Sequence, residues 1–466
     1  MKKIITLSFA LCIVFTSCYD DIVYLKKDAK LNFSSSTVTF DTIFTTVTSI
    51  TKRLVVHNPY NADLLTDVYL KGGEQSYFSI NVNGVSTRNL RDVKIPAKDS
   101  IFIFIKAILN PNQKNTPFLI SDTIGFITNG NKQDVELLAY GQDANFIIAD
   151  RKLGSIKYKI VAKEGETTTW TKDKPYVIYG YAVVDSVGKL IIEPGTQIYV
   201  HKKGGLWVYK GGCLNVNGTM DEPVVFQGDR LESFFQDDYE QWDRIWINEG
   251  SQDNIINYAI IKNAFIGIQA EILEKDMGNK LILTNSIIKK SYGMGFLAKN
   301  YTVHAYNNII SECKQYCVAL LQGGNYRFIH NTIYNTYNME IRNTPSLFFS
   351  NYYISDNVMY LSDFQCEFTN NIVWGNNNRE FACDYDKSVD FNVSIQNCLL
   401  KSDTIYPDYF ISPILNKNPQ FENEDEEDFQ LKSVSPCKGA GLTTPFVTVD
   451  RKGNSRNSPP SIGAYE

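Results

Sequence analysis

Four polar side chains in the second half of the sequence could act together on an anionic sugar. Lys299, Gln322, Arg342 and Asp363 stand near the ends of the words GFLAKN, VALLQG, MEIRN and MYLSD. If these words form equivalent strands of a repeat, Lys299 and Arg342 lie two repeats apart, about 10 Å at the usual strand spacing. One basic side chain, in its uncharged form, could abstract a proton α to a sugar carboxylate while the other, as a cation, neutralises that carboxylate. Lys299 and Arg342 are therefore the catalytic candidates, and Gln322 and Asp363 are ligand-binding candidates; an ordinary polar surface is the alternative.

Two aromatic residues could stack on sugar rings. Tyr334 and Trp374 each stand three places after an asparagine of the repeat described below. Because exposed aromatic patches generally mark binding surfaces, we predict both as ligand-binding residues. Inward packing, or cover by a loop, is the alternative for these two rings.

The acidic clusters and the four histidines predict no metal site. The stretch FFQDDYEQWDR (234–244) offers paired carboxylates of the kind that glycoside hydrolysis needs, but a strand with a structural Trp242 explains it as well. The run ENEDEED (422–428) offers oxygen ligands for calcium without diagnostic spacing, and no histidine pair has the spacing of metal ligands. We expect no metal and no other cofactor, with calcium left as an unsupported possibility.

A recurring asparagine indicates the elements that would position these residues. It stands 20 to 28 residues apart, at Asn257, Asn285, Asn308, Asn331, Asn351, Asn371 and Asn397. Each asparagine borders a short run rich in Ile, Val, Tyr and Thr, which is typical of strands. A period of this length indicates one supersecondary unit stacked on itself. We therefore predict a parallel β-solenoid in which amides stack from coil to coil.

Specific words at both ends of this region strengthen that prediction. LIIEPGTQI (190–198), GGCLNVNGTMDEPVVF (211–226) and QWDRIWI (241–247) come first, and NPQF (418–421), DFQLKSVSPCKGAG (428–441), VDRKGNSR (449–456) and SIGAYE (461–466) come last. They resemble the right-handed parallel β-helix proteins of the pectin-lyase-like superfamily. The resemblance implies a right-handed parallel β-helix over residues 146–466, closed by a C-terminal cap at 440–466.

The same resemblance bears on the reaction. The hydrolase branch of the superfamily carries NTD, DD, GHG and RIK words in order, and residues 146–466 contain only a DD, at 237–238. Glycoside hydrolysis of that type is therefore not expected. The lyase branch needs a basic residue and cations, for which Lys299 and Arg342 are the candidates.

The N-terminus resembles a bacterial lipoprotein signal. Lys2 and Lys3 precede an apolar run that is too short to span a bilayer, and Thr16-Ser17-Cys18 looks like a lipobox. The resemblance implies a signal peptide at 1–17, lipid on Cys18 and a tether at 18–30. The following Tyr19-Asp20-Asp21 resembles a surface-export signal. We expect an outer-membrane protein held by lipid alone and facing the cell exterior.

Residues 31–145 alternate apolar and polar side chains in about seven runs separated by turn residues, which predicts a β-sandwich. The order of motifs resembles immunoglobulin-like domains, whose usual role is a spacer or packing partner.

Besides Cys18, seven cysteines remain in the mature chain, an odd number without a CxxC pair. We expect mostly buried free thiols. One disulfide, Cys366 with Cys383, is an open alternative.

Charge and architecture together set the functional expectation. The full chain carries a net charge of −5, and no basic stripe is present, so nucleic-acid binding is not expected. The fold class predicted is all-β, with an N-terminal immunoglobulin-like β-sandwich followed by a right-handed parallel β-helix. We expect a surface protein that binds extracellular polysaccharide without turnover. The alternatives are a polysaccharide lyase that uses the Lys299 and Arg342 face, and a structural adhesin or spacer.

Overall fold

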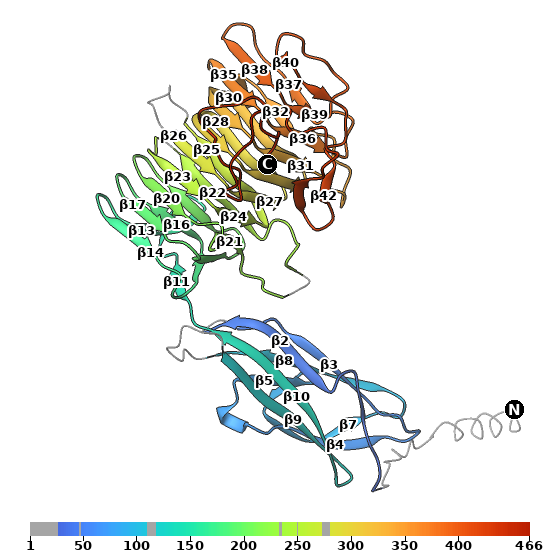
Figure 1. Cartoon of the computed structure of the whole chain (residues 1–466). Helices are drawn as coiled ribbons and strands as arrows, with labels where there is room; N and C mark the ends of the chain where they lie inside the picture. The colour runs from blue at the N-terminus through green and yellow to red at the C-terminus, as the bar shows by residue number, and fades with distance from the viewer. Residues whose placement is uncertain (1–26, 46–47, 110–117, 233–234, 249, 273–279) are drawn as a thin grey trace, which may run out of the picture. The chain divides into compact units, whose positions relative to one another are not determined.

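The computed structural model describes residues 27–45, 48–109, 118–232, 235–248, 250–272 and 280–466. The chain divides into two compact units, Met1–Asp143 and Ala144–Glu466 (Figure 1). The predicted signal peptide, Cys18 and the acidic residues after it lie outside the described residues. No helix among the described residues is long and apolar enough to cross a membrane.

The first unit consists of two five-stranded sheets. One has the order β1 (Asn32–Phe33), β3 (Lys52–His57), β8 (Ser100–Ala107), β5 (Phe78–Val82) and β6 (Val85–Thr87). The other has the order β2 (Thr37–Phe44), β10 (Asn131–Gln142), β9 (Phe118–Thr128), β4 (Leu64–Leu70) and β7 (Asn89–Ile95), and a short 3-10 helix, η1, spans Gly73–Gln75. The expected alternation is present in β8, where Ile101, Ile103 and Ile105 are buried and Phe102 and Phe104 are exposed.

The second unit is a parallel β-helix, which confirms that part of the prediction. Its 11-stranded sheet, here called face C, contains β11 (Asn145–Ile148), β15 (Tyr176–Tyr179), β18 (Gln197–Val200), β21 (Val224–Gly228), β24 (Ala259–Lys262), β27 (Ile287–Ser291), β29 (Ile309–Cys313), β31 (Thr332–Asn335), β36 (Ile372–Gly375), β39 (Leu399–Leu400) and β41 (Ile414–Leu415). Neighbouring strands of face C pair in parallel, and each belongs to one coil.

The 18-stranded sheet forms two further faces. Face A contains β12 (Arg151–Leu153), β13 (Ile156–Ala162), β16 (Tyr181–Val184), β19 (Gly205–Val208), β22 (Trp242–Asn248), β25 (Ala264–Glu271), β32 (Leu347–Phe349) and β37 (Phe381–Cys383). Face B contains β14 (Thr167–Trp170), β17 (Lys189–Ile192), β20 (Cys213–Asn217), β23 (Asn254–Asn257), β26 (Lys280–Thr284), β35 (Phe364–Thr369), β38 (Phe391–Gln396) and β40 (Phe410–Ile411). The long strands β28 (Met294–Tyr306) and β30 (Tyr316–Ile329) run through both faces.

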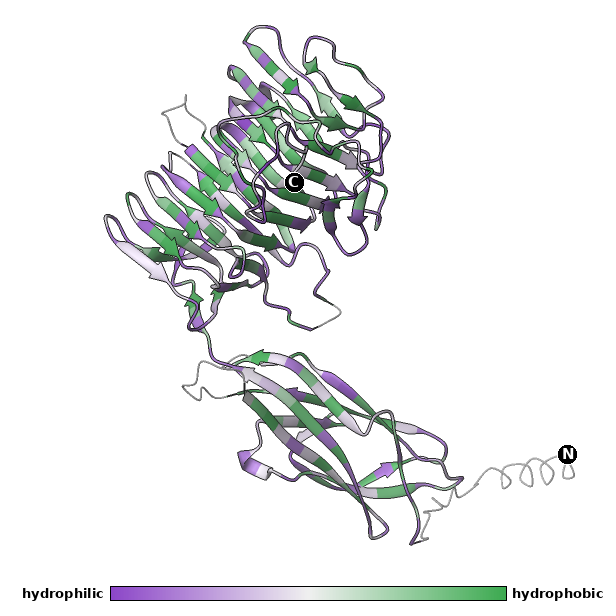
Figure 2. Ribbon diagram, viewed as in Figure 1, coloured by the Kyte–Doolittle hydropathy of each residue, from purple (hydrophilic) through white to green (hydrophobic). Residues whose placement is uncertain are grey.

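The interior of the β-helix is filled by one stack of inward side chains. On each strand alternate residues point inward, as in β26, where Leu281 and Leu283 are fully buried. Figure 2 shows hydrophobic residues along the strands and hydrophilic ones in the connecting loops. Phenylalanines such as Phe328 and Phe368, 6.0 Å apart, stack in the later coils. Burial of this continuous apolar column is the main force that stabilises the fold.

The structure contains a stack of side-chain amides, as predicted, but not all of the predicted asparagines belong to it. Asn308 N donates to Asn331 Oδ1 at 2.9 Å, and Asn331 N donates to Asn371 Oδ1 at 2.7 Å. Ser286 precedes these in the same ladder, and Cys398 follows them. All of these side chains are fully buried. The ladder satisfies backbone donors in the corner between faces B and C.

A second column stands one residue earlier in each coil. Tyr258, Asn285, Asn307, His330, Asn370 and Asn397 all have positive φ, from 46° to 57°. Asn tolerates this left-handed geometry best of the non-glycine residues. The predicted column therefore mixed two columns, since Asn285 and Asn397 belong to the turn and Asn308 to the buried ladder. Asn351 belongs to neither and bonds Asp386 O at 2.8 Å.

The cysteines are free thiols, as expected for most of them. Cys366 and Cys383 form no disulfide, so that open alternative is not realised. Burial raises the pKa of Cys398 to about 12 and that of Cys383 to about 11, which keeps both thiols protonated and unreactive.

The C-terminal segment covers the side of the β-helix. The antiparallel pair β42 (Phe421–Asn423) and β43 (Asp428–Leu431) packs with Ile462, Ala464 and Tyr465 against outward residues of face C. Gly463 N donates to Asn370 O at 2.8 Å, and Ala464 N donates to Thr332 Oγ1 at 3.1 Å. These contacts lie along face C, on the side of the later coils, whereas the prediction placed the segment as a cap on the end of the solenoid. A hairpin of β33 (Tyr352–Ser355) and β34 (Val358–Leu361) projects between β32 and β35.

Candidate functional site

The predicted catalytic pair is not assembled, because Arg342 is a buried structural cation. Its word MEIRN lies in the loop between β31 and β32 and forms no strand. The guanidinium makes a two-pronged pair with Glu380, with Nη1 to Oε2 at 2.9 Å and Nη2 to Oε1 at 2.6 Å. The two side chains are 2% and 0% exposed. No ligand carboxylate can reach Arg342, so its assignment to the catalytic pair was wrong.

The other three members of the predicted column lie apart. Lys299 faces outward on β28, where Nζ is 3.2 Å from Glu271 Oε2 and 4.0 Å from the centre of the Tyr353 ring. Its neighbour in register is Leu321, whereas Gln322 sits at a left-handed turn (φ 63°) and is buried. Asp363 precedes β35 on face B and accepts from Asp390 N at 3.1 Å. The column fails because the coils differ in length and contain bulges.

Tyr334 and Trp374 are neighbours in register, but they do not form an open platform. They lie on β31 and β36 of face C, which the C-terminal segment covers. Tyr334 is buried against Phe421 and Phe429, with ring centres 5.4 Å and 5.1 Å away, and its hydroxyl bonds Glu424. Trp374 is half-buried, with Lys401 Nζ 5.1 Å from its ring. Cover by a later segment is the alternative that the structure realises.

The acidic clusters serve as local partners. Asp237 pairs with Lys290 at 2.5 Å, and this bond lowers the pKa of Asp237. Trp242 is buried and donates to Lys262 O at 2.8 Å, a structural role. In the run 422–428, Glu424 and Glu427 bond Tyr334 and Lys289. Among the described residues, no group of three His, Cys, Asp or Glu side chains could hold a metal ion.

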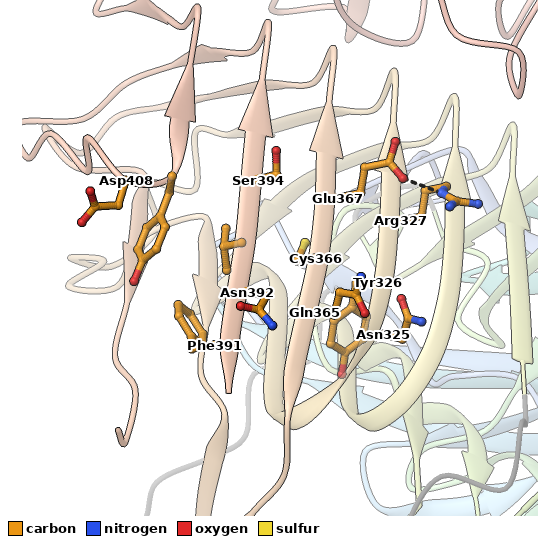
Figure 3. Close-up of a pocket in the computed structure, with 12 residues that line it drawn as sticks. Asn325, Tyr326, Arg327, Gln365, Cys366, Glu367, Phe391, Asn392, Ser394 and Asp408 are labelled. Carbon is orange, nitrogen blue, oxygen red and sulfur yellow. Dashed lines mark hydrogen bonds and ion pairs between the residues drawn. The ribbon is translucent and has the colours of Figure 1, made fainter. Parts of the chain in front are cut away.

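A polar groove lies on the outer surface of face B, at the later coils. It has a volume of about 370 Å³ and is called the amide groove here. Strands β30, β35 and β38 supply its base, and their outward side chains stand in two rows (Figure 3). One row is Asn325, Gln365 and Asn392, and the other is Arg327, Glu367 and Ser394.

The first row continues toward earlier coils. Asn325 pairs in register with Thr302 of β28, which pairs with Lys280 of β26. Lys280, Thr302, Asn325, Gln365 and Asn392 thus form one line of polar side chains across five strands. Successive members are separated by one strand spacing, about 4.8 Å. An extended ligand lying across the strands would meet a hydrogen-bonding group at each step.

Aromatic rings line the end of the groove at β38 and β40. Phe391 stacks on Tyr385, with ring centres 4.5 Å apart and planes 3° apart, and meets Tyr409 edge-on at 5.8 Å. Tyr385 remains exposed. Phe391 lies between Tyr385 and the buried Phe364, whose ring centre is 4.9 Å away, so Tyr385 supplies the ring that stays exposed at this end.

The charges beside the groove are largely balanced. Arg327 Nε bonds Glu367 Oε2 at 2.6 Å (Figure 3). The exposed ring of Phe446 lies 4.3 Å from the guanidinium. His304 neighbours Arg327 in register, and burial, Lys280 and Arg327 lower its pKa, so the imidazole is neutral at pH 7. Arg327 holds Glu367, and a second carboxylate, Asp408, lines the groove just before β40. Besides these charged groups, the groove offers amides, a hydroxyl and aromatic rings.

The sequence contained only a weak signal for this groove. The alternation of β30 places Asn325 and Arg327 on one face, but 40 residues separate Arg327 from Glu367. Because a hairpin and a long loop intervene, the register between those coils is visible only in the structure.

One protein family matches the first coils of the β-helix. Residues 162–242 match the family model of a pectate-lyase-like β-helix domain. No curated protein matches the chain. A protein of unknown function from Porphyromonas gingivalis W83 is 15% identical, with a TM-score of 0.20; the match covers 28% of this chain and spans 58% of that one.

Two other solved structures are similar in part. The ASH/PapD-like domain of human CEP192 is 14% identical over 25% of this chain and 87% of that one, with a TM-score of 0.18. The catalytic unit of a GH87 alpha-1,3-glucanase from Streptomyces thermodiastaticus is 13% identical over 77% of this chain and 76% of that one, with a TM-score of 0.35. The similarity to the pectate-lyase-like β-helix family therefore falls on the first coils of this parallel β-helix.

Proposed function

We propose that this protein binds an extracellular polysaccharide in the amide groove without cleaving it. The observation that carries the proposal is the line of five polar side chains, from Lys280 to Asn392, that crosses face B at one strand spacing. A polysaccharide repeats its hydroxyl-rich rings along its length. The polar side chains of face B also repeat at a regular spacing, so successive rings would each meet a hydrogen-bonding group. The exposed ring of Tyr385, which stacks on Phe391, would give such a ligand an apolar contact at one end.

Binding without turnover is favoured over a lyase by the surroundings of the basic residues. Lys299 is engaged by Glu271 and by the Tyr353 ring, and Arg342 by Glu380. A general base must reach the proton that it abstracts, and a cation must reach the substrate carboxylate. Arg342 is too deeply buried to meet a ligand on the outer surface, and Lys299 is already paired with a carboxylate.

The proposed setting is the cell surface. Lipid on Cys18 would anchor the protein, and the β-sandwich, proposed to be immunoglobulin-like, would act as a spacer between anchor and β-helix. This setting rests on the sequence of residues 1–21 and on the order of motifs in 31–145. Labelling of intact cells with an antibody, with and without the substitution Cys18→Ala, tests the anchor.

Affinity electrophoresis through gels that contain single polysaccharides tests the binding site. The double variant Gln365→Ala/Asn392→Ala removes two adjacent members of the row, and we expect it to weaken binding about tenfold or more. Asn215→Ala is the matched control, because Asn215 lies on face B in an earlier coil, in line with the Arg327 row. Equal loss in both variants, or no loss in the double variant, would show that the groove is not the site.

Turnover is tested on the same polysaccharides. Each retained polymer is incubated with the protein and assayed for new reducing ends and for ultraviolet absorbance of unsaturated products. We expect neither signal. Unsaturated products would establish a lyase, and Lys299→Ala would then show whether Lys299 takes part.

A further inference from the structure

A second hollow lies at the corner where faces C and A meet in the first coils. Turns of two successive coils, at Gly180 and at residues 201–204, stack there beside Asp243 and Arg244 of β22 in the third coil, and the β12–β13 hairpin closes one side. The space measures about 880 Å³ and is called the basic hollow here. Gly180 has a φ of 91°, and a Cβ there would lie 2.7 Å from Lys157 O, so glycine permits this close approach of hairpin and turn.

Positive charge gathers around the basic hollow. Lys157, Lys202 and Lys203 are exposed on its rim, and none of them forms an ion pair within the part of the chain that the structure describes. His201 also lies on the rim, where Nδ1 is 2.7 Å from Asp229 Oδ2, a hydrogen bond that raises the pKa of the imidazole. This local excess contrasts with the net charge of −5 of the whole chain.

The carboxylate in the basic hollow is already neutralised. Asp243 lies 2.8 Å from Arg244 Nη2 and accepts a hydrogen bond from the Tyr181 hydroxyl. It therefore does not cancel the three rim lysines. A concave site lined by one sign of charge concentrates the opposite charge. An anionic group is the ligand that this rim would attract.

Aromatic rings form the floor between these charges. Trp246 is half-buried and stacks on Trp207, with ring centres 4.9 Å apart, and Trp246 Nε1 donates to Glu271 Oε1 at 2.7 Å. Tyr179 lies 4.6 Å from the His201 ring. These contacts fix ring faces beside the cations, so a ligand that combines a ring with a negative charge would use both.

We propose that the basic hollow is a second binding site, which takes a sugar ring bearing an anionic substituent, either a sulfate ester or a carboxylate. This proposal rests on the proposed glycan-binding function but uses different coils and different residues. The amide groove would hold uncharged stretches of a polymer, and the basic hollow would select polymers that carry charge.

Three polymers with one backbone test the proposal: dextran, carboxymethyl-dextran and dextran sulfate. We expect the full protein to bind one or both charged forms more tightly than dextran, with an affinity that falls as salt rises. The variant Lys202→Ala/Lys203→Ala should weaken that binding about tenfold, and Lys202→Arg/Lys203→Arg should retain it. The charged polymer that binds more tightly identifies the anionic group as a sulfate ester or a carboxylate.

The control variant is Lys417→Ala/Lys432→Ala, which removes two exposed lysines outside the basic hollow. Equal weakening by both alanine variants would mean diffuse attraction, and it would overturn the proposal. No preference for the charged polymers would also overturn it, as would unchanged binding in Lys202→Ala/Lys203→Ala. The groove variant Gln365→Ala/Asn392→Ala separates the two sites. If this variant no longer binds neutral polymers but still binds charged polymers more tightly, the result for the amide groove and the result for the basic hollow are independent.

Discussion

His330 occupies the place in its turn that asparagine holds in neighbouring coils. Its φ is 57°, close to those of Asn307 and Asn370, and its side chain is fully buried. Nε2 lies 3.0 Å from Asn370 Nδ2, so Nε2 acts as the acceptor and the imidazole is neutral. Burial and the nearby Arg456 cation hold the pKa of His330 well below its usual range. The residue thus links the stability of the turn to pH.

The sign of this linkage gives the first prediction. In the unfolded chain His330 takes up a proton below about pH 6.5, whereas in the folded chain it remains neutral to much lower pH. The unfolded state therefore binds more protons, and stability is lost as pH falls below 6.5. By pH 5 the loss from this group reaches at most about 2 kcal/mol.

The substitution His330→Asn tests this linkage, because Asn fits the left-handed turn and does not titrate. We expect the free energy of unfolding of the variant, measured by urea titration, to fall less than that of the parent between pH 7 and pH 5. Parallel curves for the two proteins over that range would contradict the argument.

Residue type alone did not distinguish a ligand-binding cation from a structural one. Arg342 meets Glu380, which lies 38 residues further along the chain and is reached only because the coil closes. A buried pair of this kind is strongly destabilised when one partner is removed. The cysteines illustrate the opposite case, since the expectation of mostly buried free thiols needed only composition; Cys366 and Cys383, left open as a disulfide, are both free, the first buried and the second partly exposed.

At the scale of elements, the buried amide ladder ties each coil to the next. The Asn331 side chain donates to Ala305 O and to Asn371 Oδ1, both at 2.9 Å, and accepts from Asn308 N at 2.9 Å. Two of these bonds join backbone groups of the preceding coil to the Asn331 side chain, and the third joins that side chain to the Asn371 side chain of the next coil. The ladder therefore specifies the register of the coils as well as stabilising them.

The second prediction follows from that ladder. Asn331→Ala leaves the Asn308 N–H and the Ala305 carbonyl without their partners in a fully buried site, and each such group costs about 1–3 kcal/mol. We expect a loss of about 3 kcal/mol in the free energy of unfolding. Asn392→Ala, on the exposed surface of β38, should change it by less than about 0.5 kcal/mol. Similar losses in the two variants would show that the ladder adds nothing to ordinary burial.

The strands could be predicted from the sequence, but the register between strands of neighbouring coils could not. Alternation of apolar residues and a period of 20 to 28 residues sufficed for the parallel β-helix. The offset between Asn285 and Asn308 could not be predicted, because asparagine serves both the left-handed turn and the buried ladder, one residue apart. The amide groove depends on register across coils of unequal length, so only its individual strands were foreseeable.

At the scale of the whole molecule, the two units have separate hydrophobic cores. The core of the first unit contains residues from Ala29 to Ala139, and that of the β-helix contains residues from Ala162 to Leu400. Both proposed binding sites lie wholly within Ala144–Glu466. Each unit therefore has the apolar interior that independent folding requires.

The fragment 144–466 tests whether recognition belongs to the β-helix alone. Because both sites and the covering C-terminal segment are retained, we expect its affinity for each polysaccharide to stay within about twofold of that of the full chain. Calorimetry of the full chain should show a transition that coincides with the melting of this fragment, since a unit with its own core unfolds on its own. A fragment that melts at the same temperature but no longer binds would place part of the recognition in residues 31–143, and the β-sandwich would then be more than a spacer.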